Sequence, residues 1–193
     1  MCIRDRPLTM KQYNPDIYHR HSIRLKGYDY SQEGLYFITI CTQNHKHLFG
    51  EIKTVPHVGT VGVGSACPES NINIPQMILN PYGEIIQQCY WDLEHKYPNI
   101  ECCEYVIMPN HFHAIIKIDR DAFRAGNPRP YVVTLGHIVG YFKYQSTKMI
   151  NLHGQKLWQR NYYEHIIRDE KAYHNISNYI LNNPAQWAYD RLR

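Results

Sequence analysis

The chain has 193 residues, the size of one domain that can bury a core. With 21 Lys and Arg against 17 Asp and Glu, its formal net charge of +4 permits a polyanionic partner without requiring one. The six cysteines form no C-x-x-C pair, which argues against a disulfide framework or a zinc knuckle, and no membrane span or signal peptide is apparent, so we expect an intracellular protein without a membrane partner.

The N-terminal third of the chain predicts a tail, a hairpin and a loop. Residues 1–18 are expected to form a flexible tail, and 19–193 a single domain. The segments GLYFITICT (34–42) and HKHLFGEIKT (45–54) are rich in aromatic and β-branched residues on either side of a short polar turn, which predicts a β-hairpin. Residues 55–77 collect Pro, Gly, Ser and Asn with no periodic face, which predicts a long surface loop.

Three helices follow from capping and periodicity. Asn80 with Pro81 begins a helix that ends before Pro98, with an apolar face of Ile86, Cys89, Tyr90 and Leu93. Thr134 caps a second helix, whose apolar face is Leu135, Ile138, Val139 and Phe142. Asp169 begins a third helix, which is predicted to run through Asn183 and to end at Pro184.

The remaining extended segments set the fold class. ECCEYVI and FHAIIKI flank the tripeptide MPN and predict two strands, and LWQRNYYEHIIR reads as an irregular extended segment. The element order is therefore β-β-α-β-β-α-(β)-α. It predicts an α+β fold with an antiparallel sheet of about four to five strands and helices packed on one face.

Three H-x-H pairs occur, and the middle residue distinguishes them. Side chains alternate across a strand, so His111 and His113 share one face while Phe112 points into the core. In the pairs 19/21 and 45/47 the middle residue is Arg or Lys, which predicts exposed segments. Two imidazoles on one strand face can chelate a divalent cation if another element adds a third ligand, and otherwise they are polar residues at a strand end.

A partner for that pair is found in the last helix. Tyr179 and Asn183 are four residues apart in NYILNNP, so both side chains can reach one point on the shoulder of the helix. The alternative is that Tyr179 lies at the edge of the core and Asn183 caps the helix before Pro184. Tyr162 and Tyr163 compete with Tyr179, but Ile166 and Ile167 stand four positions after them.

Four segments in order carry a family resemblance: GLYFITICTQNHKHLFGEI, YVIMPNHFHAIIKI, LGHIVGYFKYQSTKMIN and LWQRNYYEHIIRDEKAYHNISNYILNNP. The chain resembles the REP-associated tyrosine transposases of the single-tyrosine HUH superfamily, to which the IS200-like transposases belong. The resemblance spans most of residues 19–190. It implies a ferredoxin-like HUH endonuclease fold, with His111, His113 and Asn183 as metal ligands and Tyr179 as the nucleophile. Insertion-sequence relatives usually have Gln in place of Asn183, and the shorter Asn requires a closer approach of helix and sheet.

The resemblance also implies a reaction and a location. With Mg²⁺ or Mn²⁺ as cofactor, Tyr179 would form a 5′-phosphotyrosine linkage and release a 3′-OH on single-stranded DNA beside a REP-type hairpin. The protein would be cytoplasmic in a bacterium and would associate with the nucleoid when acting on DNA. Insertion-sequence relatives act as dimers, and a homodimer remains open here. The candidate DNA contacts are Arg24, Lys26, Tyr28, Lys143, Lys148, Arg160 and Arg168.

Three alternatives stay open at this point. A sheet-based nucleic-acid-binding module would need base-stacking aromatics on the sheet, but no RNP-like motif is present. A metal-dependent nuclease that uses activated water would form no covalent adduct. A domesticated member of the family would bind hairpin DNA without strand transfer.

Overall fold

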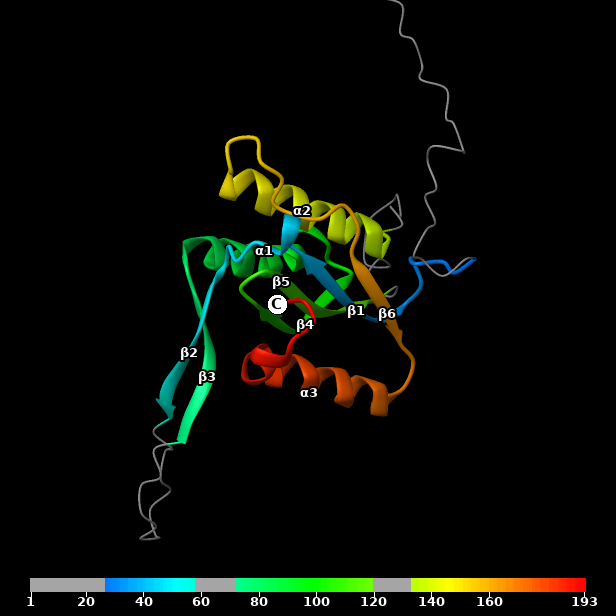
Figure 1. Ribbon diagram of the computed structural model, residues 1–193. Coiled ribbons are helices and arrows are strands. Elements are labelled where there is room, and N and C mark those ends of the chain that lie inside the picture. The colour runs from blue at the N-terminus through cyan, green and yellow to red at the C-terminus, as the bar shows by residue number, and fades with distance from the viewer. Residues whose placement is uncertain (1–26, 58–71, 120–132) are drawn as a thin grey trace, which may run out of the picture.

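A four-stranded antiparallel sheet forms the centre of the molecule (Figure 1). The computed structural model describes residues 27–57, 72–119 and 133–193. The sheet has the order β4-β5-β1-β6, and each neighbouring pair is antiparallel. Its strands are β1 (Gly34–Cys41), β4 (Ile100–Ile107), β5 (His111–Ile118) and β6 (Tyr163–Ile167). The predicted α+β fold with an antiparallel sheet is confirmed.

The two strands between β1 and the first helix form a separate two-stranded sheet. Strand β2 (Gly50–His57) pairs with β3 (Ile72–Leu79), and β1 does not pair with β2 because β5 and β6 occupy both of its edges. The predicted hairpin of 34–42 with 45–54 is therefore wrong. The loop predicted for 55–77 is also too long, since its described ends are strand residues. Pro56 and Pro75 argued against strands, but a two-stranded sheet has an open edge on each strand, where proline is tolerated.

The helices begin where their caps predicted. Helix α1 (Pro81–Lys96) starts with the side chain of Asn80 accepting hydrogen bonds from the amides of Tyr82 and Gly83. Helix α2 (Leu135–Ile150) starts at a capping box formed by Thr134. Helix α3 (Glu170–Gln186) is capped by Asp169 but continues through Pro184, so its predicted end is wrong. A proline in the last turn removes only one hydrogen bond of the helix.

The helices divide between the two faces of the sheet, as Figure 1 shows. Helices α1 and α2 cover one face, where Phe112 and its neighbours on β1 and β5 build the larger core. On the other face α3 packs through Ile180 against a smaller cluster of Phe37, Ile115 and Ile167. The expected single helical layer thus holds for α1 and α2 only. Because His111 and His113 point away from Phe112, they lie on the face that α3 covers.

The predicted tail, residues 1–18, lies outside the described residues. Within the described part of the chain, no helix combines the length and the apolar character that crossing a bilayer requires.

Candidate active site

The two histidines of β5 are buried side by side at the start of the strand. His111 is 0% exposed and His113 is 2% exposed, and their ring centroids are 4.6 Å apart. Each ring is held through Nδ1: that of His111 lies 2.8 Å from Asn110 Oδ1, and that of His113 lies 2.8 Å from Thr39 Oγ1. Both Nε2 atoms are therefore left for other partners.

Burial keeps both imidazoles neutral at physiological pH. It lowers the pKa of His111 to about 4, although the negative charge of Asp190 opposes this effect. The pKa of His113 falls well below its usual range, first because of burial and then because of the neighbouring His111. Neutral imidazoles have a lone pair to offer, so these side chains suit a cation or a hydrogen-bond donor.

Tyr179 meets the second histidine. Its hydroxyl lies 3.2 Å from His113 Nε2, and its ring packs edge-on against Phe37 at 6.2 Å between centroids. The side chain is 40% exposed, so solvent reaches the phenol from one side. Burial and the charge of Asp190 raise the pKa of Tyr179, while the side chain of Asn183 lowers it. The phenol is therefore protonated at neutral pH.

Asn183 lies one turn beyond Tyr179 and is almost completely buried, with 2% of its surface exposed. Its Oδ1 has no hydrogen-bond partner within the described part of the chain. Asn183 and Tyr179 line the same pocket, to which Tyr189 and Asp190 also contribute. The last helix thus brings a phenol and a free amide oxygen to the histidine end of the sheet.

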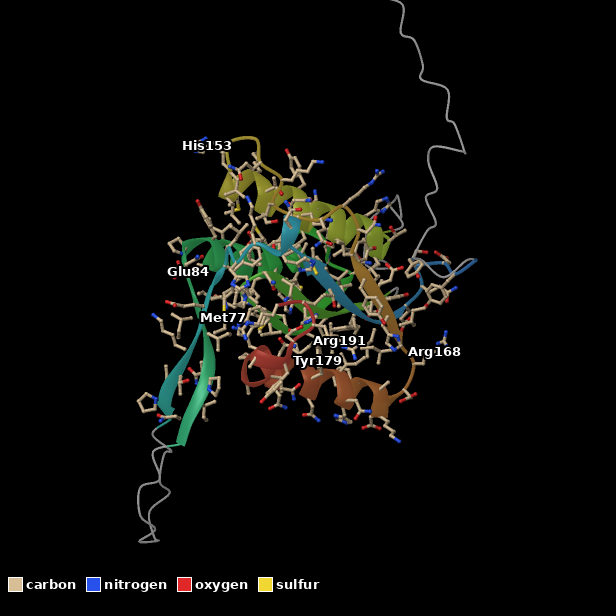
Figure 2. All side chains as sticks on the ribbon, viewed as in Figure 1. Met77, Glu84, His153, Arg168, Tyr179 and Arg191 are labelled. Atoms are coloured by element: carbon tan, nitrogen blue, oxygen red, sulfur yellow. The ribbon has the colours of Figure 1, made fainter. Side chains whose placement is uncertain are left out.

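Residues after α3 complete this region, and Figure 2 shows Arg191 of this segment near Tyr179. Asp190 Oδ2 lies 3.5 Å from His111 Nε2, and the Trp187 ring is 6.1 Å from the His111 ring. The carbonyl of Leu192 accepts a hydrogen bond of 2.6 Å from Asn110 Nδ2. No spacing pattern marks Asp190 in the sequence, because a lone acidic residue near a chain end is ordinarily a solvated charge.

The residues that the structure describes contain no group of three or more His, Cys, Asp or Glu placed to hold a metal. Yet three buried atoms of this region have no partner there: His111 Nε2, Asn183 Oδ1 and Asp190 Oδ2. Unpaired buried acceptors are costly, and a cation satisfies acceptors of this kind. Nitrogen and oxygen acceptors of these kinds are ligand types for divalent cations.

Of the competing tyrosines, Tyr163 shares the Phe37 ring with Tyr179, and Tyr162 lies on the other side of the sheet. Tyr163 on β6 is 56% exposed and packs against Phe37 at 6.5 Å between centroids. Tyr162 packs against the larger core on the opposite side of the sheet. The described contacts bring only the Tyr179 hydroxyl to the histidine pair. His45 and His47 are exposed, as their pair predicted, while His19 and His21 lie outside the described residues.

The predicted DNA contacts do not form one surface. Arg24 and Lys26 lie outside the described residues. Tyr28 packs against Tyr30 and places its hydroxyl 3.2 Å from that of Tyr36. The ammonium group of Lys143 donates hydrogen bonds to backbone carbonyls at 159 and 160, so it fastens α2 to the following segment.

Three of the candidates, Lys143, Lys148 and Arg160, line a basic groove beside α2. Lys148 and Arg160 are exposed and line it with Lys156 and Tyr144. Among the described residues, no acidic side chain lines this groove. One lining residue, Gln159, donates its backbone amide hydrogen to the carbonyl of Cys41, which pairs with His111 in the sheet.

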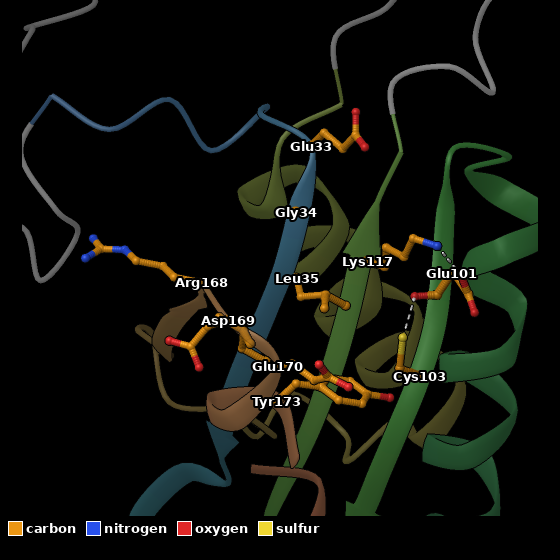
Figure 3. A pocket seen from close by; sticks show the side chains of 11 residues that line it. Glu33, Gly34, Leu35, Glu101, Cys103, Lys117, Arg168, Asp169, Glu170 and Tyr173 are labelled. Carbon is orange, nitrogen blue, oxygen red and sulfur yellow. Dashed lines mark hydrogen bonds and ion pairs between the residues drawn. The ribbon is translucent and has the colours of Figure 1, made fainter. Parts of the chain in front are cut away.

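Arg168 lies apart from that groove, in a pocket at the other end of β1 (Figure 3). Four carboxylates line this pocket, from Glu33, Glu101, Asp169 and Glu170. Its two cations are Arg168 and Lys117, and the latter pairs with Glu101 at 2.9 Å. The excess of negative charge makes this end of the sheet a poor phosphate site.

Comparisons with known proteins give the family and the fold. No family model matches the chain. An uncharacterized protein of Haemophilus influenzae is 40% identical over 194 residues, which cover 94% of this chain and 97% of that protein, so the two belong to one family. A second H. influenzae protein, named as a REP-associated tyrosine transposase, is 24% identical over 169 residues, covering 83% of this chain and 76% of its own length.

A solved structure shares the fold. The structure of a REP-associated tyrosine transposase bound to a REP hairpin matches with a TM-score of 0.56 and 18% sequence identity, covering 89% of this chain and 77% of that one. At this identity the likeness shows a common fold.

Proposed function

The chain is related in sequence and in fold to the REP-associated tyrosine transposases, and from this premise we propose that it nicks and rejoins single-stranded DNA next to REP-type hairpins. Tyr179 is the proposed nucleophile, and a covalent 5′-phosphotyrosine is the proposed intermediate. The relatives support a DNA-acting transposase in general, and the chemistry rests on the side chains of this chain.

One observation carries the proposal: the Tyr179 hydroxyl lies 3.2 Å from Nε2 of His113, which shares its strand face with His111. A phenol that is partly exposed and next to two neutral imidazoles can reach a phosphate arriving from solvent. Burial of the histidines and the packing of Phe37 against the tyrosine ring keep this arrangement in place before DNA binds.

The residues that would hold a cation are His111, His113 and Asn183. Two imidazoles and a carboxamide carry no charge, so they leave the charge of a divalent ion available to a phosphate. Mg²⁺ or Mn²⁺ bound there would act as a Lewis acid toward the scissile phosphodiester. In the structure His113 Nε2 faces the Tyr179 hydroxyl instead, so the phenol must turn away from this nitrogen toward the substrate.

The proposed step exchanges one phosphodiester for another. The Tyr179 oxygen attacks phosphorus, the bond between phosphorus and the 3′ oxygen breaks, and the electron pair goes to that oxygen. The phenol loses its proton and the released 3′ oxygen gains one. Because a phosphodiester is kept, the 3′-OH of another strand can reverse the step without ATP.

The basic groove lined by Lys148, Lys156 and Arg160 is the proposed contact for the hairpin backbone. Phosphates bind such cations with little dependence on sequence, and the exposed ring of Tyr144 offers a stacking surface for an unpaired base. From this groove the single-stranded flank would have to pass the sheet edge to reach the histidines, which lie on the face that α3 covers.

Adduct trapping tests the proposal. Purified protein, Mn²⁺ and labelled single-stranded hairpin DNA should give a protein–DNA adduct that survives denaturation. Tyr179→Phe should abolish it, whereas Tyr163→Phe should retain it. DNA cleavage without an adduct would favour a nuclease that uses activated water. Hairpin binding without cleavage would favour a domesticated DNA-binding protein.

A further inference from the structure

We propose that Asp190 is an additional, anionic ligand of the cation, contributed by the segment that follows α3. This inference rests on the proposed function, because it requires a cation at His111. It concerns a residue outside the H-x-H pair and outside α3.

The proposal starts from two atoms, one on His111 and one on Asp190, that face each other without a hydrogen bond between them. His111 Nε2 and Asp190 Oδ2 are 3.5 Å apart, and neither has a hydrogen-bond partner in the described chain. The His111 side chain is fully buried and that of Asp190 is 9% exposed, so bulk water solvates neither atom well. The separation is longer than an N–H···O hydrogen bond, which spans about 2.7–3.2 Å.

The tautomer of His111 makes the contact unfavourable as it stands. Asn110 presents Oδ1 to His111 Nδ1, and its Nδ2 donates to the carbonyl of Leu192, which fixes the orientation of the amide. An amide oxygen can only accept, so Nδ1 carries the hydrogen and Nε2 carries the lone pair. In this tautomer the Nε2 lone pair faces the Asp190 carboxylate oxygen at 3.5 Å.

A cation between the two atoms removes this conflict. Two ligand atoms that bind one ion at about 2.0–2.2 Å lie about 3–3.5 Å apart, depending on whether the geometry is octahedral or tetrahedral. The observed 3.5 Å falls at the upper end of that range. A carboxylate is the ligand type that Mg²⁺ and Mn²⁺ prefer, and it supplies the negative charge that the His–His–Asn set lacks.

The carboxylate is already oriented for this purpose. Asp190 Oδ1 accepts a hydrogen bond of 2.7 Å from the amide of Leu192, while the Asp190 amide donates to the carbonyl of Trp187. These bonds direct the remaining oxygen, Oδ2, toward His111. Cation binding would thus also fasten residues 187–193 to the histidine strand.

Calorimetric titration of the full chain with Mn²⁺, in the absence of DNA, tests the assignment. Asp190→Asn keeps the shape of the side chain and removes its charge, so we expect affinity for Mn²⁺ to fall at least about tenfold. His111→Ala should abolish binding, and the exposed control Glu51→Gln should leave it unchanged.

Thermal melting without metal separates a ligand from a structural ion pair. Metal-free Asp190→Asn should melt at or above the temperature of the wild type, because its amide can donate to His111 Nε2, and Mn²⁺ should raise its melting temperature less. Wild-type affinity in Asp190→Asn, with binding lost in His111→Ala, would overturn the role of Asp190 and leave the proposed function standing. If Asp190→Asn without metal melts below the wild type and its affinity for Mn²⁺ is unchanged, Asp190 belongs to an ion pair with His111 instead. Failure of the wild type to bind Mn²⁺ would overturn both proposals.

Discussion

Tyr173 on α3 donates its phenolic hydrogen to the carboxylate of Glu104 on β4, with the two carboxylate oxygens 2.8 and 2.9 Å away. The hydroxyl of Ser177 adds a third hydrogen bond of 3.0 Å to the same group. These contacts lie six and two residues before Tyr179 on the same helix. They therefore help to set the position of the candidate nucleophile over the sheet.

Removing the Tyr173 hydroxyl should loosen α3. Tyr173→Phe eliminates a hydrogen bond to a charged acceptor, and because the site is partly exposed we expect a loss of about 1 kcal/mol in unfolding free energy. Urea denaturation followed by circular dichroism measures this loss. Tyr189→Phe is the control, since that side chain is 90% exposed. Equal stabilities of the two variants would show that the hydrogen bond to Glu104 contributes nothing.

The same contact predicts a pH dependence. Burial raises the pKa of Glu104, but hydrogen bonds from its backbone, Tyr173 and Ser177 outweigh burial and leave the pKa below its ordinary value. A carboxylate with a depressed pKa stabilises the fold above its unfolded pKa of about 4.3, and this contribution is lost as the pH falls through the folded value. Wild type should thus be more stable than Glu104→Gln at pH 6, and the difference should shrink toward pH 3. A difference that grows on acidification would contradict this sign.

Phe112 anchors the strand that presents the histidines. Its ring is fully buried and packs against Phe142 at 5.0 Å and Tyr90 at 5.2 Å between centroids. Phe112→Leu should lower the unfolding free energy by about 1 kcal/mol, and Phe112→Ala by about 3–5 kcal/mol. Chemical denaturation checks the order of the two variants. A cost below about 1 kcal/mol for alanine would mean that the core collapses around the missing ring.

The sequence predicts the local features of this fold better than the pairing of its strands. Helix caps and the alternation around Phe112 are local signals, so the helix starts and the strand faces were predictable. Pairing partners are not local: β1 joins β5 and β6, which follow it by more than 70 residues, and no local rule indicates this. The prolines of β2 and β3 also argued against strands in these segments, although the open edges of a two-stranded sheet tolerate proline.

The residues of the candidate site also separate into those that the sequence predicted and those that it did not. His111, His113, Tyr179 and Asn183 were identified because strand and helix periods place them on defined faces and because the family resemblance assigns their roles. Asp190 was not predicted as a site residue, because its approach to His111 depends on how the chain turns after α3. Pro184 also wrongly suggested that the helix ends before this turn. Lys143 was assigned to DNA from its charge, whereas its ammonium group binds backbone carbonyls.

Asn110 should position His111 without binding a cation itself. Asn110→Ala removes the acceptor for His111 Nδ1, and loss of such an outer contact typically lowers metal affinity by about 10–100-fold. Asn110→Asp keeps an acceptor at this place and should retain more of the affinity. Mn²⁺ titration of both variants measures the effect, with the exposed Asn182→Ala as control. An alanine variant that binds Mn²⁺ as the wild type does would exclude a positioning role.

The basic groove predicts a salt-dependent loss of DNA binding. Lys148→Ala and Arg160→Ala each remove one exposed cation from the groove, so each should weaken binding of hairpin DNA and reduce the slope of log affinity against log salt by about 1. Lys53→Ala, an exposed lysine on β2 that pairs with Glu51, should change neither quantity. Fluorescence anisotropy at several salt concentrations provides both numbers. If all three variants lose affinity equally, the loss reflects net charge alone and the hairpin does not bind in this groove.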